Sequence, residues 1–438
     1  MSTACKGIFI VGAKRTPFGT FGGVFKNTSA TELQTLANVA ALKEAGVAPA
    51  LVDTVNVGQV MSATQTDGIY TPRHAALKAG IPIEKPVLGV NRLCGSGFQS
   101  VVNSAQDILT GAAKISLAGG VENMSQAPFA VRNVRFGTML GTNIAFEDTL
   151  WAGLSDSYCG LPMGMTAEKL GAQFGITRDE VDAYALSSQQ KWKKAHDAGI
   201  FKAEIEPVTL KIKRKDVTVD TDEHPRPQTT IDSLKKLPPV FKKEGLVTAG
   251  SASIKRKDVT VDTDEHPRPQ TTIDSLKKLP PVFKKEGLVT AGSASGICDG
   301  AGSIVVASEE ACKSLKPLAR LVGWAYVGVD PSIMGVGPVP AIEALLKATK
   351  LTLNDVDLIE INEAFCAQTL ACAKALKLDM SKLNVNGGAT ALGHPLGASG
   401  SRITAHLVHE LKRRGLKRGI GSACIGGGQG IAIMVESV

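Results

Sequence analysis

Several features that would place the chain in a common class are missing from it. No apolar run reaches eighteen residues, so we expect no transmembrane segment. The eight cysteines form no CxxC pair, which argues against a structural zinc site or a thioredoxin-like redox motif. Neither GxGxxG after the first expected strand nor a Walker lysine occurs, so neither of these phosphate-binding loops is expected. The chemistry must therefore reside in other segments.

Acidic residues are absent from the first 31 positions, and the first to occur is Glu32. The same stretch carries four basic side chains and no secretory pattern, a bias typical of matrix-targeting segments. Residues 7–11 within it have the composition of a core strand, so cleavage there would damage the fold. We expect a mitochondrial matrix location with an uncleaved signal, and a cytoplasmic location is the alternative.

The composition indicates a globular chain. Its 438 residues are enough for two or three domains around a large core, and 43% of them are hydrophobic. The net charge of +8 comes from lysines and arginines dispersed among acids, which indicates a solvated surface. An acidic ligand such as a nucleotide phosphate would also suit this charge. No nucleic-acid-binding motif accompanies it, so no nucleic-acid partner is expected.

Hydrophobic periodicity alternates between strand and helix, which indicates an α/β fold. Ser29 and Glu32 have capping-box spacing at the start of the first helix, and Gly46 suits its end. The order of elements repeats, giving two similar βαβαβαββ halves. In the first half we predict strands at 8–11, 55–57, 87–90, 115–118 and 303–307, with helices at 31–45, 72–79 and 94–109. In the second we predict strands at 319–329, 358–361, 384–386, 419–423 and 431–435, with helices at 341–348, 363–376 and 398–411.

An insertion separates parts of the first half. We assign residues 1–122 and 298–317 to the first half, 318–438 to the second, and 123–297 to the inserted domain. Inside the insertion, residues 212–253 recur without change as 254–295. Such identity indicates a recent tandem duplication or, as we favour, an error in the assembled gene. If both copies exist, one is accommodated as a loop at a cost on the order of 1–2 kcal/mol, because closure entropy grows only logarithmically.

Cys94 stands in the segment Asn-Arg-Leu-Cys-Gly-Ser-Gly between a predicted strand and a predicted helix. At a helix N-terminus the dipole and the free N–H groups stabilise a thiolate. Most lone cysteines are core residues, and we assign the others that way apart from Cys424. The small residues after Cys94 let a substrate approach closely, which favours a nucleophile there.

Three further segments share this position after a strand. His394 lies in Gly-His-Pro-Leu-Gly before a helix, which suits a catalytic base or a hydrogen-bond donor. Cys424 runs into three glycines whose N–H groups suit an oxyanion, although a plain turn is the alternative. Asn362 begins the segment Asn-Glu-Ala-Phe. Loops at the carboxyl ends of strands form sites in open α/β sheets, so these segments are expected to meet. His406 and His409 lack further ligands, and no metal site is expected.

Taken together and in this order, the four segments resemble those of the thiolases, and within them the 3-ketoacyl-CoA branch of mitochondrial type (acetyl-CoA acyltransferases). The likeness covers the chain apart from one copy of the repeat. It implies a thiolase fold, with two halves packed as αβαβα layers and an inserted loop domain. It implies thiolytic cleavage of 3-oxoacyl-CoA by CoA to acetyl-CoA and a shortened acyl-CoA, as in fatty acid β-oxidation, and the reverse Claisen condensation. CoA is then a co-substrate, no cofactor is bound permanently, and a homodimer or homotetramer is expected.

The resemblance also implies roles for single residues. Cys94 is the nucleophile that forms an acyl-cysteine, and His394 takes its proton. Cys424 protonates the acetyl-CoA enolate and acts as the base in the reverse direction. One oxyanion hole uses His394 with a water held by Asn362, and the other uses the backbone N–H groups of Cys94 and Gly426.

In this family the inserted domain binds CoA, which implies Ser295 near the pantetheine and Arg268 near the nucleotide. The repeat makes Arg226 an equal candidate to Arg268. Ser295 is preferred to Ser253, because only Ser295 continues into Gly296 as the family pattern requires. The resemblance further implies a tunnel lined by Leu154, Met163, Phe365 and Phe283, the last with Phe241 as its equal.

Pro162 departs from the His-Met-Gly that acetoacetyl-specific thiolases tend to carry. Proline removes a polar side chain near the acyl pocket, so we expect cleavage of medium or longer 3-oxoacyl-CoA. The alternatives are an acetoacetyl-CoA thiolase (acetyl-CoA C-acetyltransferase), a hydrolase that releases the acyl-cysteine to water, and an inactive CoA-binding protein if the duplication disrupts the site.

Overall fold

The computed structural model describes residues 2–64, 68–212, 215–225 and 287–438. In this part of the chain eleven strands form one sheet, with the main path β15-β16-β17-β14-β2-β13-β6-β4-β5. Short β1 (Ser2–Ala4) pairs with β14, and β3 (Gly19–Thr20) pairs with β13. The path is weakest where β14 meets β2, through only Ala319↔Ile10 and Arg320↔Phe9. This short junction joins two halves of similar topology.

The first half has the strand order β2-β13-β6-β4-β5. β4 pairs in parallel with β5 and β6, whereas β13 runs antiparallel between β2 and β6. The predicted capping box of Ser29 and Glu32 and the left-handed stop at Gly46 bound the first helix. The strands are β2 (Ile8–Arg15), β4 (Thr54–Gly58), β5 (Val87–Val90), β6 (Ile115–Asn123) and β13 (Cys298–Ser308), and the helices are α1 (Ala30–Ala45), α2 (Thr71–Lys78) and α3 (Ser96–Leu109).

The second half repeats this order as β14-β17-β16-β15, with a single parallel bridge from Ile359 to Leu383 beyond β15. The predicted strand at 384–386 is wrong. Asn384 has a φ of 45°, and its side chain bonds to the backbone of Ile361 on both sides, so the chain leaves the sheet there. The elements are β14 (Ala319–Gly328), β15 (Leu358–Ile361), β16 (Arg418–Ile425), β17 (Gln429–Ser437), α9 (Pro338–Thr349), α10 (Cys366–Leu376), α11 (Ala389–Leu392) and α12 (Ser399–Arg414).

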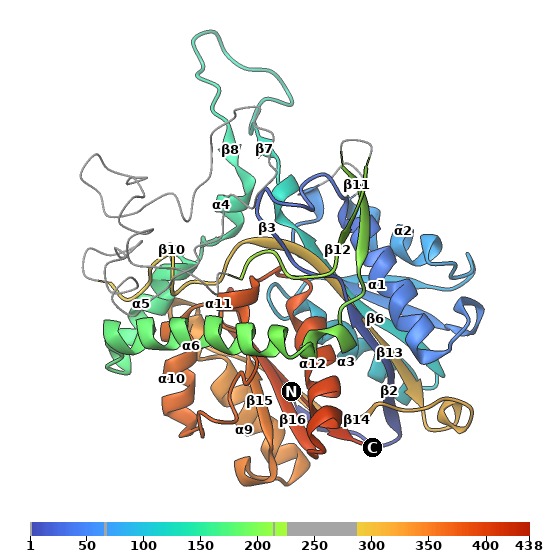
Figure 1. Cartoon of the computed structure of the whole chain (residues 1–438). Helices are drawn as coiled ribbons and strands as arrows, with labels where there is room; N and C mark the ends of the chain where they lie inside the picture. The colour runs from blue at the N-terminus through green and yellow to red at the C-terminus, as the bar shows by residue number, and fades with distance from the viewer. Residues whose placement is uncertain (1, 65–67, 213–214, 226–286) are drawn as a thin grey trace.

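The helices arrange the two halves in layers (Figure 1). α3 packs on β4 and β6, α12 packs on β13 and β16, and these two helices contact each other in the middle of the molecule. α1 covers the outer face of the first half with α2 beside it, and α9 covers the outer face of the second half with α10 beside it. This arrangement confirms the predicted αβαβα layering.

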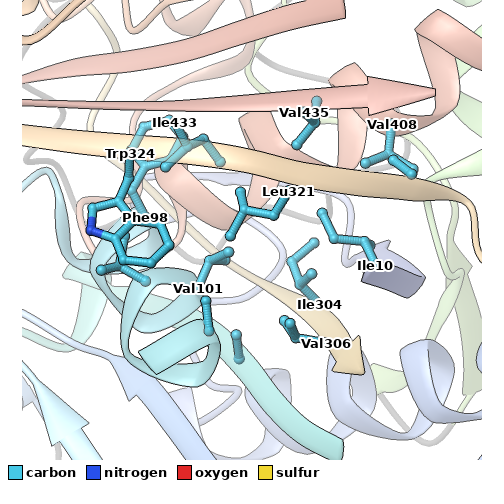
Figure 2. Close-up of a cluster of buried hydrophobic side chains, with 14 of the residues drawn as sticks. Ile10, Phe98, Val101, Ile304, Val306, Leu321, Trp324, Val408, Ile433 and Val435 are labelled. Atoms are coloured by element: carbon cyan, nitrogen blue, oxygen red, sulfur yellow. The ribbon is translucent and has the colours of Figure 1, made fainter. Parts of the chain in front are cut away.

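One buried cluster joins the halves through the middle layer. Phe98 of α3 and Trp324 of β14 lie together in it, beside Ile433 of β17 (Figure 2). Ile10 and Ile304 belong to the same cluster and come from the first half. Each fully buried side chain of this size contributes roughly 1.5–3 kcal/mol, so parting the halves would expose a large apolar area.

The insertion leaves the first half after β6 and returns at β13. Of the repeated stretch, the structure describes the start of the first copy, through residue 225, and the end of the second, from residue 287. No helix in the described part of the chain is long and apolar enough to cross a membrane. The elements are β7 (Phe129–Ala130), β8 (Glu147–Asp148), α4 (Thr149–Gly153), β9 (Ser155–Asp156), β10 (Leu161–Pro162), α5 (Met163–Gln173), α6 (Arg178–Asp197), β11 (Val208–Ile212) and β12 (Lys215–Val219).

Candidate active site

Cys94 lies on a sharp turn between β5 and α3. Leu93 before it has a φ of 45°, a left-handed conformation that is rare for a leucine. Ser96 holds this turn, since its Oγ accepts from Arg92 N at 2.9 Å and donates to Leu93 O at 2.7 Å. The helix begins at Ser96 rather than at Cys94 as predicted. The strained turn sets the thiol just before the helix.

Glycines bring the loops of both halves together around this turn. A Cβ on Gly95 would lie 2.6 Å from Ile425 Cδ1, next to Cys424. A Cβ on Gly97 would lie 2.6 Å from Ser401 N and 2.8 Å from Gly397 O. The backbone clash excludes any side chain at Gly97, whereas a side chain at Gly95 would require the end of Ile425 to move. The loops carrying Cys424 and His394 therefore reach Cys94 because glycine stands there.

Burial raises the pKa of the Cys94 thiol to about 11. Backbone N–H groups of Gly426 and of Cys94 itself donate to the sulfur and lower its pKa, while Glu122 raises it. Burial outweighs these donors, so the thiol keeps its proton in the resting protein. A base has to remove the proton, and two N–H groups already point at the reacting atom.

His394 is 5% exposed, and its position suits this base. Ser399 Oγ donates to Pro395 O at 3.0 Å and lies 2.5 Å from His394 Nδ1. Since a hydroxyl has one hydrogen, Nδ1 carries the ring proton and Nε2 is free to accept. Burial, together with the charge of Arg402, lowers the pKa of His394 to about 3, so the ring is neutral at ordinary pH.

Asn362 faces the accepting nitrogen of this ring, with its Nδ2 3.3 Å from His394 Nε2. Its backbone N–H bonds to Ser422 O at 2.9 Å, which fixes it beside β16. Asn362 Oδ1 is buried and has no partner among the described residues. A buried carbonyl of this kind is able to hold a water, which is the role that the thiolase resemblance implies for Asn362.

Cys424 lies at the end of β16, opposite Gly430 of β17, and is fully buried. Burial, with the neighbouring Cys94 sulfur adding to it, raises the pKa of Cys424 well above its ordinary value. Both thiols are thus protonated at rest. The glycines after it, at φ of 73° and 80° for Gly427 and Gly428, form the turn to β17. Gly426, whose N–H donates to the Cys94 sulfur, stands directly before this turn, and its role at an oxyanion stays a prediction.

Two carboxylates at the site escaped the sequence analysis. Glu363 accepts from Tyr184 Oη, Ser188 Oγ, Asn384 Nδ2 and Thr390 N, which ties α6 of the insertion to the second half. This use of Glu363 explains why the helix predicted from 363 begins at Cys366. Glu122 accepts from three backbone N–H groups near Cys94. The sequence feature that could have identified Glu122 is an acidic residue directly after Gly119-Gly120-Val121, at the end of a strand.

Some of the residues that were predicted to contact CoA are described by the structure, and these lie near the thiols. Ser295 N and Oγ both bond to Ala364 O at 3.0 Å, beside Phe365. Met163 and Phe365 pack in one cluster with Cys424, and Leu154 packs in another with Cys94. Arg268 and Phe283 lie outside the described residues, as do their alternatives Arg226, Phe241 and Ser253.

The two histidines considered for a metal have other partners. His406 Nδ1 lies 2.7 Å from Glu204 Oε2, and its Nε2 lies 3.1 Å from Asn386 Nδ2. His409 Nε2 lies 2.8 Å from Ala13 O. Both histidines therefore have structural contacts, His406 in the core and His409 at its edge.

Comparisons with known proteins agree with this geometry. The model of the thiolase N-terminal domain matches residues 8–255 and 253–310, and that of the thiolase C-terminal domain matches 315–437. The human protein named 3-ketoacyl-CoA thiolase, mitochondrial, is 52% identical over 99% of this chain and 98% of its own length. An acetyl-CoA acetyltransferase of Rhizobium meliloti is 42% identical over 98% of both.

Solved structures give the same result. The crystal structure of human mitochondrial 3-ketoacyl-CoA thiolase superposes with a TM-score of 0.87 at 52% identity, covering 99% of each chain. A structure of the human enzyme in complex with CoA superposes with a TM-score of 0.86 at 51% identity, covering 100% of this chain and 99% of that one. Family models match most of the chain, and relatives more than half identical span nearly all of it. The chain belongs to the thiolase family.

Proposed function

We propose that the chain cleaves 3-oxoacyl-CoA with CoA, giving acetyl-CoA and an acyl-CoA shortened by two carbons. The observation that carries this proposal is that two cysteine thiols are neighbours, that two N–H groups donate to the Cys94 sulfur, and that the loop of the neutral His394 packs on Gly97 in the first turn of α3. The human relative carries this activity in its name, 3-ketoacyl-CoA thiolase. The chain is accordingly an acyltransferase of the thiolase type.

The first step is the attack of Cys94 Sγ on the 3-carbonyl carbon. His394 Nε2 accepts the thiol proton, because Ser399 fixes the ring proton on Nδ1. The N–H groups of Cys94 and Gly426 stabilise the oxyanion that forms. The bond between C2 and C3 then breaks, and its electron pair becomes the enolate of acetyl-CoA.

Cys424 supplies the proton that converts this enolate to acetyl-CoA. The high pKa that burial gives Cys424 suits an acid for so basic a carbon. His394, with a water on Asn362 Oδ1, would bind the enolate oxygen. The Cys424 thiolate then takes the proton of the CoA thiol, and the CoA sulfur attacks the acyl-Cys94 thioester. The Cys94 sulfur leaves and regains its proton from His394. Run backward, Cys424 takes the α-proton of acetyl-CoA for Claisen condensation.

CoA serves as co-substrate, and its proposed contacts come from the insertion. Ser295 is held at Ala364 O and is the proposed contact of the pantetheine. Leu154, Met163 and Phe365 are proposed as lining of the acyl and pantetheine tunnel, because they share clusters with the two thiols. Arg268 and Phe283 remain proposed contacts. The unit boundaries 1–122 with 298–317, 123–297 and 318–438 are also part of the proposal.

Medium or longer acyl chains are the proposed substrates. Pro162 precedes Met163, whose Sδ would lie 3.5 Å from a Cβ on Gly426, so residue 162 stands close to the reacting groups. Proline offers no polar side chain there. Turnover should therefore be greater with a 3-oxoacyl chain of six to ten carbons than with acetoacetyl-CoA. Equal or better turnover of acetoacetyl-CoA over every longer chain would favour acetyl-CoA C-acetyltransferase instead.

Self-association is proposed on two exposed surfaces. The edge strand β5 presents Leu88, which is 52% exposed. The arm between β7 and β8 projects from the body (Figure 1) and exposes Phe136, Met139 and Leu140 almost completely. Large exposed apolar groups of this kind mark protein contacts. Light scattering of the purified chain should give a dimer or a tetramer, whereas a monomer would overturn this part. Mitochondrial location is proposed from the relatives' names.

The test of the main proposal compares the full chain with a version lacking residues 254–295. Acetyl-CoA release from a medium-chain 3-oxoacyl-CoA is measured for both at saturating CoA. Similar rates are expected, because the four motifs lie outside the repeat and the shorter chain keeps one full copy of it, with Ser253 in place of Ser295 before Gly296. Activity only in the shorter chain would mean that the duplication blocks the CoA site. CoA binding without turnover in either chain would support the inactive binding protein, and acid release without CoA would support the hydrolase.

A further inference from the structure

Glu122 is a fully buried carboxylate at the end of β6, and its bonds reach two loops from different halves of the molecule. Its Oε1 accepts from Met61 N at 2.9 Å. Its Oε2 accepts from Val60 N at 3.1 Å and from Gly397 N at 3.0 Å. Val60 and Met61 follow β4 of the first half, whereas Gly397 belongs to the His394 loop of the second half. One side chain thus holds both loops.

Three converging N–H groups explain why the residue is an acid. An ionised carboxylate only accepts, and it does so on two oxygens, whereas a glutamine would turn one of its two polar atoms toward these donors as a further donor. Among the described residues no cationic side chain forms an ion pair with Glu122. When Glu122 is ionised, its negative charge is therefore stabilised by the backbone N–H groups of these two loops.

The backbone of the His394 loop packs closely around the hydrogen bond between Gly397 N and Glu122. A Cβ on Gly397 would lie 2.3 Å from Val121 O and 2.8 Å from Gly58 O. A Cβ on Gly120 would lie 2.0 Å from Gly397 O. The backbone of Gly397 thus presses directly on β6 and β4, and Glu122 closes the contact with a charged hydrogen bond.

The same loops face the nucleophile. Leu396, Val60 and Met61 pack in one cluster with Cys94. The Glu122 charge also acts on the sulfur, since it raises the pKa of Cys94. Burial in turn raises the pKa of Glu122 to about 7, against the lowering by its three donors, and Asp299 adds to the rise. A buried acid so costly to ionise is typical of functional sites.

We propose that Glu122 is a positioning residue of the thiolase reaction, which sets the His394 loop against the Val60–Met61 loop so that the imidazole meets Cys94 and the enolate. It acts through His394 and does not touch the substrate. This inference rests on the proposed function, because its effect is expressed in the two steps that need His394. Those steps are the deprotonation of Cys94 and the stabilisation of the enolate.

The experiment uses two variants of the full chain, one that changes the length of the side chain at position 122 and one that removes its charge. Glu122→Asp keeps the charge but draws the carboxylate back by one methylene, so it cannot reach both loops. Glu122→Gln keeps the length and loses one acceptor. Both are compared with wild type by kcat and KM for CoA in thiolysis, and by exchange of the acetyl-CoA methyl protons in D2O. Each rate is divided by the number of active sites in which Cys94 can be acetylated.

We expect kcat per acylatable site and the exchange rate to fall together, about thirtyfold in Glu122→Asp and about tenfold in Glu122→Gln, with KM for CoA within twofold. A merely structural role would lower the number of acylatable sites and leave the rate per site unchanged. Asp299→Asn is the matched control. Asp299 is a buried carboxylate on the neighbouring β13, and its side-chain bonds to described residues go to Met124 and Ser125. Its loss should leave both rates within about threefold.

Three results would overturn the inference. The first is a rate per site within twofold of wild type in both variants. The second is an equal loss in Asp299→Asn. The third is a rise in KM for CoA with kcat intact. If Glu122→Gln does not fold, Glu122→Asp alone decides, since it retains the buried charge. Absence of thiolysis and exchange in the wild type would instead overturn the proposed function.

Discussion

At the scale of the residue, the site divides the labour between two thiols with raised pKa values. Cys94 has two N–H donors on its sulfur, whereas Cys424 lies fully buried beside it. Neither thiol is ionised at rest. Reactivity must therefore come from proton transfer within the complex with substrate rather than from a standing thiolate.

Removing each thiol should have a different effect. Cys94→Ala should lower thiolysis and condensation by at least about a thousandfold, because no acyl-enzyme forms. Cys424→Ala should lower methyl-proton exchange of acetyl-CoA by about 100- to 10,000-fold. It should still accept an acyl group on Cys94, as mass spectrometry of the intact chain would show. Substantial exchange in Cys424→Ala would remove this cysteine from the proton-transfer role.

The tautomer of His394 gives a second prediction at this scale. Ser399→Ala removes the oxygen that fixes the proton on Nδ1, so kcat should fall about tenfold, the equivalent of one hydrogen bond of about 1.4 kcal/mol. KM for CoA should stay the same. Ser401→Ala is the control, since its Oγ bonds to Ala398 O and not to the histidine. An unchanged kcat in Ser399→Ala would mean that other contacts fix the ring.

At the scale of the element, buried charges anchor the insertion to both halves. Arg15 of β2 pairs with Glu204 at 2.7 Å and with Asp222 at 2.6 Å, and His406 of α12 pairs with the same Glu204. Glu204 and Asp222 belong to the insertion. Removing one partner of a buried pair leaves the other charge unpaired, so Glu204→Gln should destabilise the protein by about 3 kcal/mol. Urea unfolding followed by circular dichroism measures this loss, and a change below about 1 kcal/mol would contradict it.

This network should also give the stability a dependence on pH. Burial opposes the charge of His406, but Glu204 outweighs it, with Glu360 and Glu410 adding, and raises the pKa of His406 above its ordinary value. The folded state then holds this proton more tightly than the unfolded one. The contribution is complete below about pH 6.5 and is lost as pH rises through the folded pKa.

The melting temperature, measured as a function of pH, tests this contribution of His406 to stability. We expect the difference between wild type and His406→Gln to shrink from pH 6 to pH 9. Glu204 stays ionised throughout this range, because His406 and Arg15 outweigh burial and hold its pKa well below its ordinary value. A difference that grows with pH would show that the neutral ring, bonded to Asn386, is the stabilising form.

At the scale of the whole molecule, the duplication lengthens the connection between two anchored ends. Asp222 is held by Arg15, and Leu288 and Val289 are held by Glu168 at 2.7 and 2.6 Å. Removing residues 254–295 deletes Leu288 and Val289, but the identical Leu246 and Val247 of the first copy then stand at the same distance before Gly296. With these two residues bonded to Glu168, the stretch that begins at Asp222 is roughly threefold shorter. Loop-closure entropy then predicts a gain of about 1 kcal/mol in the free energy of unfolding. Urea midpoints of the two chains test this, and a less stable short chain would contradict it.

Much of the fold could be predicted from local patterns. The capping box at Ser29 and the glycine stop at Gly46 marked α1, because these interactions lie within a few residues of one another. The predicted strand at 384–386 failed because Asn384 bonds to Ile361, a contact that no local pattern contains. The catalytic motifs were visible because glycine and the reactive residue are adjacent in sequence.

The sequence by itself determined the α/β order, the two repeated halves and the four motifs, since each depends on neighbouring residues or on fixed spacing. Only the tertiary structure decided the protonation of the site and the contacts between its loops. Burial raises the pKa of both thiols, and Ser399 selects the tautomer of His394. Glu122 bonds to Gly397, which is 275 positions away in the chain, and to Met61, which is 61 positions away. These properties depend on which groups face each other and on how little water reaches them, and neither is written in local sequence.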